Sequence, residues 1–397
     1  MKLLVTLCFL SAAFASRAQW VEGPAFPSGP TDGCYSFTIG NRVFCGGGLE
    51  SNRLYEYNSY TNTWLDLGKA GAGGIRGWAF AFTIGPKAYV CGGANGDPSN
   101  LMKDLWEYNS DSNVWTKKAD MPKALDGGFA FSLGGKGYIG CGFNGTYMVS
   151  DFYEYDPEKN EWRALNDYPG GMLLFPSSFV INEKAYVVGG AGTAETGSLY
   201  RYEPSTDTWT SLADFPGELR QAGAAFTLAN IGYYGGGMQG YTTTFRDIWS
   251  YDPEKDLWSN TGMELPHQYT AWITATGSGP SSIGAPQWAV FVAGAGFINS
   301  QLEFTSKTFI FTPQTAHVNL PSEEAIEVYP NPVHHSGELT LPSEASYAIH
   351  DAIGRSVLQG VTGSGKITLP SLAQGCYSIV FKFPQSERIV RSKFVVQ

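Results

Sequence analysis

The stretch GYIGCGFNGTYMVSDFYEYDPEKNEW (137–162) contains the pattern that decides the fold. An apolar segment at 137–142 ends in small residues, an aromatic segment follows at 152–156, and a short polar run leads to Trp162. Short apolar and aromatic segments bounded by Gly, Pro, Asn and Asp are typical of β-strands joined by turns. We therefore expect three successive strands in this stretch.

The same pattern recurs through most of the chain. Six apolar segments end in small residues: RVFCGG (42–47), AYVCGG (88–93), GYIGCG (137–142), AYVVGG (185–190), GYYGGG (232–237) and AVFVAG (289–294). The aromatic segments that follow them are LYEYN (54–58), LWEYN (105–109), FYEYD (152–156), LYRYE (199–203), IWSYD (248–252) and TFIFT (308–312). An alternating segment such as WAFAFTIG (78–85) comes before the small residues, and a Trp follows five of the aromatic segments. Each unit is predicted to hold four strands, a to d, with a period of roughly 50 residues.

This repeat resembles the kelch family over roughly residues 20 to 313. The paired Gly, the Tyr and the Trp recur at similar offsets, and the Trp-Asp signature of the shorter WD-type repeat is absent. A single four-stranded sheet cannot bury both of its faces, so such units stack face to face around an axis. The resemblance implies an all-β fold with a six-bladed kelch-type β-propeller at residues 19–313, in which these Gly, Tyr and Trp residues are structural.

Closure of the ring is predicted from one misplaced Trp. The sixth aromatic segment, 308–312, has no Trp after it, whereas Trp20 stands alone ahead of the first unit. We expect residues 19–22 to supply the missing d strand of the sixth blade. Closing the ring in this way removes an exposed sheet edge that would favour aggregation.

The first 18 residues are predicted to be a secretory signal peptide. Lys2 provides a positive start, residues 3–15 are apolar, and Ser16 and Ala18 are the small residues that a signal peptidase reads. We expect cleavage after Ala18. The rest of the chain has no apolar stretch of about 18 residues, so no transmembrane segment is expected.

Composition and charge exclude several classes of protein. Gly accounts for 49 of 397 residues, aromatic residues for 14% and charged residues for 16%, which argues against helical bundles and intrinsic disorder. Residues 19–324 contain 18 Lys and Arg against 31 Asp and Glu, and this acidic body disfavours nucleic acid and anionic lipid as partners. The six Cys form no CxxC motif, so we expect buried thiols, no metal and no cofactor. A turn at 40–41 would place Ser36, and not Cys34, opposite Cys45.

The C-terminal part forms a second unit. A polar linker is expected at 314–325, and residues 326–397 contain short alternating segments that predict a small immunoglobulin-like β-sandwich. This part resembles the type A C-terminal sorting domain of the bacterial type IX secretion system. The resemblance is carried by Tyr329-Pro330-Asn331-Pro332, Gly337, Asp351, Gly354-Arg355, Leu369 to Leu372, Gly375, Tyr377 and Lys393 to Val396. It implies the type IX machinery as partner, a secreted or cell-surface location in a Bacteroidetes-type bacterium, and a cut within or just after the linker; an ordinary adhesive sandwich is the alternative.

Candidate ligand-binding residues lie on the face that carries the long d–a and b–c connections. By alignment the first residues of the a strands are Thr31, Arg76, Leu125, Leu173, Arg220 and His267, which we expect to point toward a central funnel. Two Arg, one His and nearby aromatic side chains would suit an anionic or sugar ligand. The binding candidates are Arg76, Trp78, Arg220, Tyr241, His267 and Tyr269. The alternative is that these residues are solvated loop residues or structural ties between blades.

Signals for an enzyme are weak. Copper-radical oxidases among kelch proteins need two His at the metal, but His267 is the single His between residues 19 and 312. Sialic-acid mutarotases need acid–base groups in the funnel, a role that Glu218 with Arg220 would fill. Nucleophile-elbow, HExxH and phosphate-loop motifs are absent, and no other catalytic residue is assigned. The sequence favours an exported, non-enzymatic protein- or glycan-binding module, with a mutarotase-like enzyme as the alternative.

Overall fold

The computed structural model describes residues 19–312 and 337–396, apart from short internal segments. Those segments are residues 41, 50, 59–61, 72–73, 98–99, 229, 268–269, 272–273, 278–288, 299–300, 341–345, 351–355, 363–365, 373–374 and 383–388. The predicted signal peptide (1–18) and linker (314–325) lie outside the described residues, as do Cys8, Tyr269 and the Tyr-Pro-Asn-Pro segment at 329–332.

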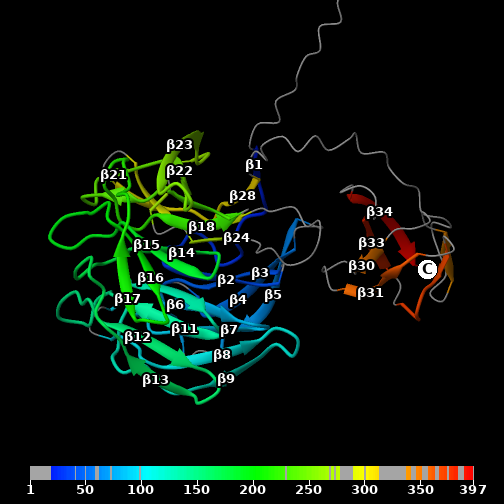
Figure 1. The fold of residues 1–397 in the computed structure, drawn as a ribbon, viewed down its shortest axis with the longest axis horizontal. Coiled ribbons are helices and arrows are strands. Elements are labelled where there is room, and N and C mark those ends of the chain that lie inside the picture. The colour runs from blue at the N-terminus through cyan, green and yellow to red at the C-terminus, as the bar shows by residue number, and fades with distance from the viewer. Residues whose placement is uncertain are drawn as a thin grey trace, which may run out of the picture.

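Six four-stranded antiparallel sheets form a β-propeller, as the repeat predicts (Figure 1). Blade 1 comprises β2 (Cys34–Ile39), β3 (Arg42–Gly47), β4 (Arg53–Asn58) and β5 (Thr63–Lys69). Blade 2 comprises β6 (Phe80–Ile84), β7 (Lys87–Cys91), β8 (Leu105–Asn109) and β9 (Val114–Lys117). Blade 3 comprises β10 (Phe129–Leu133), β11 (Lys136–Gly140), β12 (Phe152–Asp156) and β13 (Glu161–Ala164).

The other three blades follow the same order, with two additions. Blade 4 comprises β14 (Ser177–Ile181), β15 (Lys184–Val188), β16 (Leu199–Glu203) and β17 (Thr208–Ser211). Blade 5 comprises β18 (Ala224–Leu228), β19 (Ile231–Gly235), β22 (Asp247–Asp252) and β23 (Leu257–Glu264), with the short ribbon β20 (Met238–Gln239) and β21 (Thr243–Thr244) in its b–c connection. Blade 6 comprises β24 (Thr274–Gly277), β25 (Ala289–Val292), β28 (Thr308–Thr312) and β1 (Gln19–Glu22), with the ribbon β26 (Ala295–Ile298) and β27 (Gln301–Phe304). Sequence reasoning did not predict the two ribbons.

The N-terminal strand closes the ring, which confirms the prediction from Trp20. Strand β1 pairs antiparallel with β28 and places Trp20 opposite Phe311. The Trp20 ring also packs against Phe291, at 5.1 Å between centroids. The first strands of consecutive blades are in contact all the way round, and β24 of blade 6 meets β2 of blade 1.

The recurrent Tyr and Trp of the repeat are structural. In five blades the last Tyr of strand c pairs with the Trp of strand d, as Tyr155 does with Trp162. The Tyr155 hydroxyl donates to Asn160, whose positive φ of 55° forms the c–d turn. The Trp162 indole donates to the Ala119 carbonyl, in the connection that precedes the blade. The Tyr bond to the turn recurs in five blades. The Trp bond that attaches the outer strand to the preceding connection is made by Trp64, Trp162 and Trp258, whereas the Trp209 indole has no hydrogen-bond partner in the described part of the chain.

The four Cys whose side chains are described are free thiols. They are Cys34, Cys45, Cys91 and Cys141. Ser36 lies opposite Cys45 and Cys34 lies opposite Gly47, as the predicted turn requires.

Residues 337–396 form two further sheets. One sheet has the order β31-β30-β33-β34, and the other pairs β29 with β32. Their bounds are β29 (Glu338–Thr340), β30 (Ser346–His350), β31 (Ser356–Val361), β32 (Lys366–Thr368), β33 (Gly375–Lys382) and β34 (Ile389–Val396). Leu339 and Ile367 from the small sheet share one buried core with Ile349 and Ile379 from the large sheet. The arrangement agrees with a small β-sandwich.

Candidate functional site

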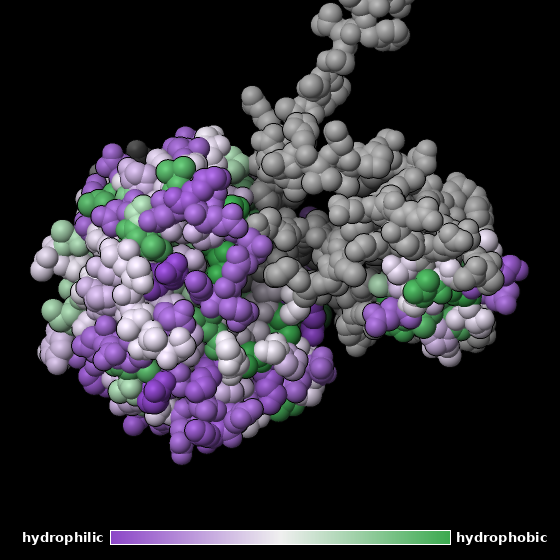
Figure 2. Space-filling model, in the orientation of Figure 1, coloured by the Kyte–Doolittle hydropathy of each residue, from purple (hydrophilic) through white to green (hydrophobic). Residues whose placement is uncertain are grey.

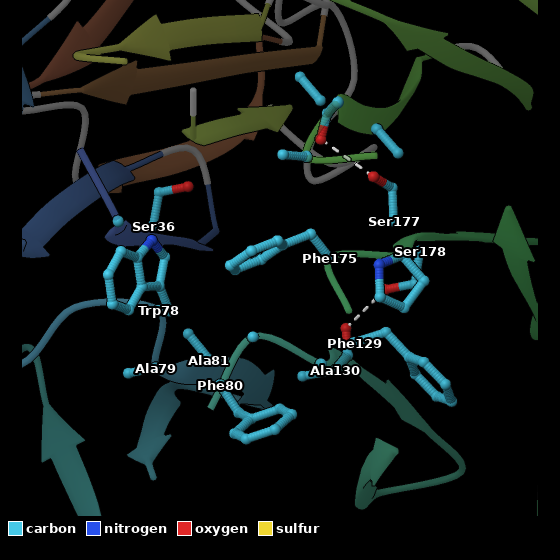
Figure 3. A pocket seen from close by; sticks show the side chains of 18 of the residues that line it. Ser36, Trp78, Ala79, Phe80, Ala81, Phe129, Ala130, Phe175, Ser177 and Ser178 are labelled. Atoms are coloured by element: carbon cyan, nitrogen blue, oxygen red, sulfur yellow. Dashed lines mark hydrogen bonds between the residues drawn. The ribbon is translucent and has the colours of Figure 1, made fainter. Parts of the chain in front are cut away.

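The first strands of the blades surround a cavity of about 220 Å³ on the propeller axis (Figure 3). Its wall consists mainly of small residues from blades 1 to 5, among them Ser36, Ala81, Ala130 and Ala225. Four aromatic residues also line it: Phe80 and Phe129 are almost fully buried, whereas Trp78 and Phe175 are partly exposed, with their rings 6.1 Å apart between centroids. Small side chains leave the axis open, so the two partly exposed aromatic rings dominate the shape of the cavity.

Five residues at one end of the cavity are linked by backbone hydrogen bonds, and we call this set of residues the mouth ring. It comprises Gly33, Trp78, Gly127, Phe175 and Ala222, one residue from each of blades 1 to 5. From Trp78 onward each amide donates to the carbonyl of the preceding member, over 2.7 to 3.0 Å. All five have positive φ, between 50° and 64°. This conformation is uncommon for a residue with a side chain and costs roughly 1 kcal/mol or more.

Large and small residues alternate around the mouth ring because each aromatic side chain lies over the preceding Gly. A Cβ on Gly33 would come within 2.9 Å of Trp78 Nε1, and one on Gly127 would come within 2.8 Å of Phe175 Cε1. Only Gly accommodates both the positive φ and the close approach of the next blade's ring. The glycines are thus needed for the placement of Trp78 and Phe175.

The hydroxyl groups of the cavity wall already donate to backbone carbonyls. Ser178 Oγ donates to the Ala130 carbonyl at 2.8 Å, and Ser177 Oγ donates to the Gly223 carbonyl at 2.9 Å (Figure 3). Both bonds join neighbouring blades. Since each hydroxyl proton is used, the lone pairs are what these oxygens offer to a ligand.

Arg76 and Arg220 do not point into the funnel, which differs from the expectation. They are 1% and 0% exposed. Arg76 donates to both carboxylate oxygens of Asp104 at 2.9 Å and to the Gly92 carbonyl, while the Trp106 indole donates to the same carboxylate.

Blade 5 repeats the arrangement. Arg220 donates to both oxygens of Asp247 and to the Gly236 carbonyl, and Trp249 donates to Asp247. Both guanidinium groups are thus occupied in structural ion pairs within their own blades.

The predicted alignment places His267 at the first position of strand a in blade 6, but in the structure His267 lies three residues before that position. Ala271 bridges Ala295 in the way that Gln221 bridges Met238 in blade 5, so Thr270 occupies the position of Arg220. The outer strand β23 is 8 residues long, against 4 for β17, and the connection that follows β23 is the shorter one.

The His267 ring stacks on Phe309, 4.7 Å between centroids. Burial, aided by the positive charges of Lys307 and Arg246, lowers the pKa of His267 to about 4. It is therefore a neutral imidazole at physiological pH.

The remaining candidates are spread over the loops. Tyr241 is 51% exposed in the b–c connection of blade 5. Glu218 is exposed in the d–a connection, and its carbonyl accepts from Arg220 Nε at 2.7 Å. Other exposed apolar side chains of this face include Ile75, Met172 and Leu219. They directly precede the buried residues Arg76, Leu173 and Arg220, which were aligned at the start of strand a. Figure 2 shows apolar side chains as scattered areas on a largely hydrophilic face of the molecule.

Three polar residues beside the mouth ring were not predicted. Asp32, Asp126 and Gln221 occupy the same position in blades 1, 3 and 5, directly before a ring member, and are 4%, 6% and 2% exposed. Burial raises the pKa of both Asp side chains to about 6. An alignment of the repeats shows that these three residues occupy the same position in their blades, but it does not show that they are buried.

Two further searches concern metals and membranes. Among the residues that the structure describes, no cluster of three or more His, Cys, Asp and Glu side chains is arranged to hold a metal ion. The same described residues contain no helix that is long and apolar enough to cross a membrane.

Family models agree with this architecture. The Kelch motif matches residues 81–122 and 172–216, and the Secretion system C-terminal sorting domain matches residues 327–397. The chain is therefore a six-bladed kelch propeller joined to a type IX secretion sorting domain. This combination supports export in a Bacteroidetes-type bacterium.

Particular relatives share part of this architecture. N-acetylneuraminate epimerases of Shigella boydii serotype 4 (strain Sb227) and Escherichia coli (strain K12) are 33% and 32% identical over 113 residues. These matches cover 26% of this chain and 30% of each relative, so the chain spans less than a third of the length of these curated relatives. The solved structure described as "Structure of YjhT" superposes with a TM-score of 0.60 at 16% identity, covering 74% of this chain and 99% of that chain, which shows a common fold.

Proposed function

We propose that the propeller is a non-enzymatic binding module that acts outside the cell or at its surface, and that its ligand is a protein or a glycan that contacts the mouth ring. In this proposal residues 1–18 direct entry into the periplasm and residues 326–397 direct passage across the outer membrane. The sorting domain is removed by a cut within or just after the linker.

The observation that carries the proposal is the pair Trp78 and Phe175. These two large aromatic residues are held in an unfavourable backbone conformation at the opening of the cavity, whereas Phe80 and Phe129, which also line it, do not have a positive φ. Strained residues that the surrounding structure maintains are concentrated at functional sites. Aromatic faces suit the apolar face of a sugar or an apolar side chain of a protein. Tyr241 and the exposed apolar loop residues would extend the contact.

A carbohydrate-active enzyme resembling an N-acetylneuraminate epimerase is the second candidate, favoured by the partial sequence similarity to those enzymes. It would use Glu218 as the acid–base group. The funnel geometry supports it less, because Arg220, the cation proposed to assist, is fully buried against Asp247.

A glycan array and a sialic-acid anomerisation assay on the full chain separate the candidates. Binding without rate enhancement, lost in Trp78→Gly and kept in the control Val114→Ala, is the expected result, since Val114 is an exposed residue at a c–d turn on the opposite face. Rate enhancement abolished by Glu218→Gln would establish the enzyme instead.

The export proposal has its own test. Removal of residues 326–397 should trap the propeller in the periplasm, and surface delivery of the truncated chain would refute the sorting role.

A further inference from the structure

The polar groups around the mouth ring share one chemical character. Asp32 and Asp126 are carboxylates, and Gln221 carries a buried Oε1 that accepts no hydrogen bond from any residue the structure describes. The hydroxyls of Ser177 and Ser178 have already used their protons. Apart from the Trp78 indole N–H, which has no hydrogen-bond partner among the described residues, the ring therefore offers a ligand mainly hydrogen-bond acceptors and negative charge.

Both carboxylates lack a cationic partner. Within the described part of the chain, no hydrogen bond or ion pair joins another residue to the carboxylate of Asp32 or Asp126; Thr31 and Phe143 donate to their backbone carbonyls. Each is more than nine-tenths buried, and burying an unpaired charge costs several kcal/mol unless it is compensated. Burial raises their pKa to about 6, so both remain ionised at neutral pH.

These residues adjoin the mouth ring along the chain, and the corresponding residue of blade 4 indicates where their side chains extend. Asp32 and Asp126 directly precede Gly33 and Gly127, which line the cavity. In blade 4 the same position is held by Leu174, whose Cδ2 would lie 3.0 Å from a Cβ on Gly127 of the preceding blade. A side chain at this position therefore reaches the ring member of its neighbour. For Asp126 that neighbour is Trp78.

Trp78 lies between the two carboxylates in the ring. Its amide donates to the carbonyl of Gly33 and its carbonyl accepts from the amide of Gly127, the residues that follow the two Asp side chains. An aromatic face beside buried carboxylates is the combination that attracts an organic cation, by charge and by cation–π interaction. The two buried Arg cannot supply that cation because Asp104 and Asp247 hold them.

We propose that the mouth ring binds an organic ammonium or guanidinium group, with Asp32 and Asp126 as carboxylate partners and Trp78 and Phe175 as aromatic contacts. The proposal rests on the proposed binding function and names the chemical class of its ligand. An excess of 13 negative charges over residues 19–324 favours the approach of such a cation.

The test compares benzylammonium and benzylguanidinium with neutral benzyl alcohol, by isothermal titration calorimetry on the full chain at pH 7.5. These probes share the aromatic ring and differ in charge. At least one cation should bind ten-fold or more tightly than the alcohol. The double variant Asp32→Asn, Asp126→Asn should reduce that preference to less than two-fold. The control Asp214→Asn removes one charge from an exposed residue of a d–a connection and should keep the preference.

The remaining outcomes separate the two proposals. If alcohol and cations bind equally, and all binding is lost in Trp78→Gly, the aromatic mouth is a binding site but the cationic ligand class is wrong. If none of the probes binds, both proposals fail for this site. Urea denaturation verifies folding, since the double Asn variant should be at least as stable as the wild type at pH 7.5. A preference that survives in that variant overturns the role of the carboxylates.

Discussion

Replacement of Trp20 by Ala tests whether the ring is closed by its first strand. The Trp20 ring contacts Phe291 and Phe311 at centroid distances of 5.1 and 4.9 Å and packs on the core between blades 5 and 6. Truncation of a buried aromatic side chain costs about 3–5 kcal/mol, and Trp20 is partly exposed, so a loss of about 3 kcal/mol is expected. For a domain of this size that corresponds to a decrease of roughly 6 °C or more in the unfolding midpoint.

The matched control lies on the same strand. Val21 is 45% exposed, because alternate residues of β1 point to opposite faces of the sheet. Val21→Ala should change the free energy of unfolding by less than about 0.5 kcal/mol. Both variants are compared with the wild type by urea denaturation and by thermal unfolding monitored with circular dichroism.

Deletion of residues 19–26 is the stronger form of the test. It removes the pairing of β1 with β28 and the backbone bond from Gly23 to Thr308, and it takes away Phe26, which is buried against Tyr55 and Trp64. The edge of β28 then becomes available for pairing with other chains, so aggregation should increase. An unfolding midpoint that stays unchanged after this deletion would refute closure by the N-terminal strand.

Two further predictions concern buried charges. Because the pKa values of Asp32 and Asp126 are raised from 3.8 to about 6, the stability they confer is fully present below pH 4 and is lost as the pH rises through 6. Relative to the wild type, the double Asn variant should therefore gain up to about 3 kcal/mol per site in unfolding free energy between pH 4 and 7.5, measured by urea titration. The lowered pKa of His267 reduces the stability of the wild type and of the double Asn variant alike as the pH falls from 6.5 to 4. This effect therefore cancels when the two proteins are compared. Asp247→Ala should cost about 3–5 kcal/mol, because it leaves the fully buried Arg220 guanidinium unpaired, and a loss below about 1 kcal/mol in urea would contradict the structural role of the pair.

The blade count and the closure could be predicted from the sequence because their signals are local. Tyr155, Asn160 and Trp162 stand within eight residues and interact with one another or with the neighbouring connection, so the motif and its structure coincide. Trp20 was informative for the same reason, since one missing Trp at the end of the repeat matched one surplus Trp at its start.

The site was harder to predict because its geometry depends on the whole ring. Arg76 was expected to point into the funnel as the first residue of strand a, but β6 begins only at Phe80, and regular alternation of side chains does not extend back to Arg76. The positive φ of Trp78 breaks that alternation just before the strand. The partner of Arg76 is Asp104, 28 residues away, and nothing in the local pattern identifies it. Phe175 was missed because the residue type at its position differs between the blades: the other ring members are Gly33, Trp78, Gly127 and Ala222.

The distribution of charge is therefore more informative about the ligand than the residue types alone. A sequence with Arg76, Arg220 and His267 near a funnel suggests an anionic ligand. In the structure the two Arg are neutralised within their blades, and burial lowers the pKa of the His to about 4. The unpaired charges beside the mouth ring are carboxylates, so binding of an anionic sugar there would add a third negative charge to a buried site. The proposed preference for cationic groups rests on these carboxylates and on the partners that the two Arg have in the structure.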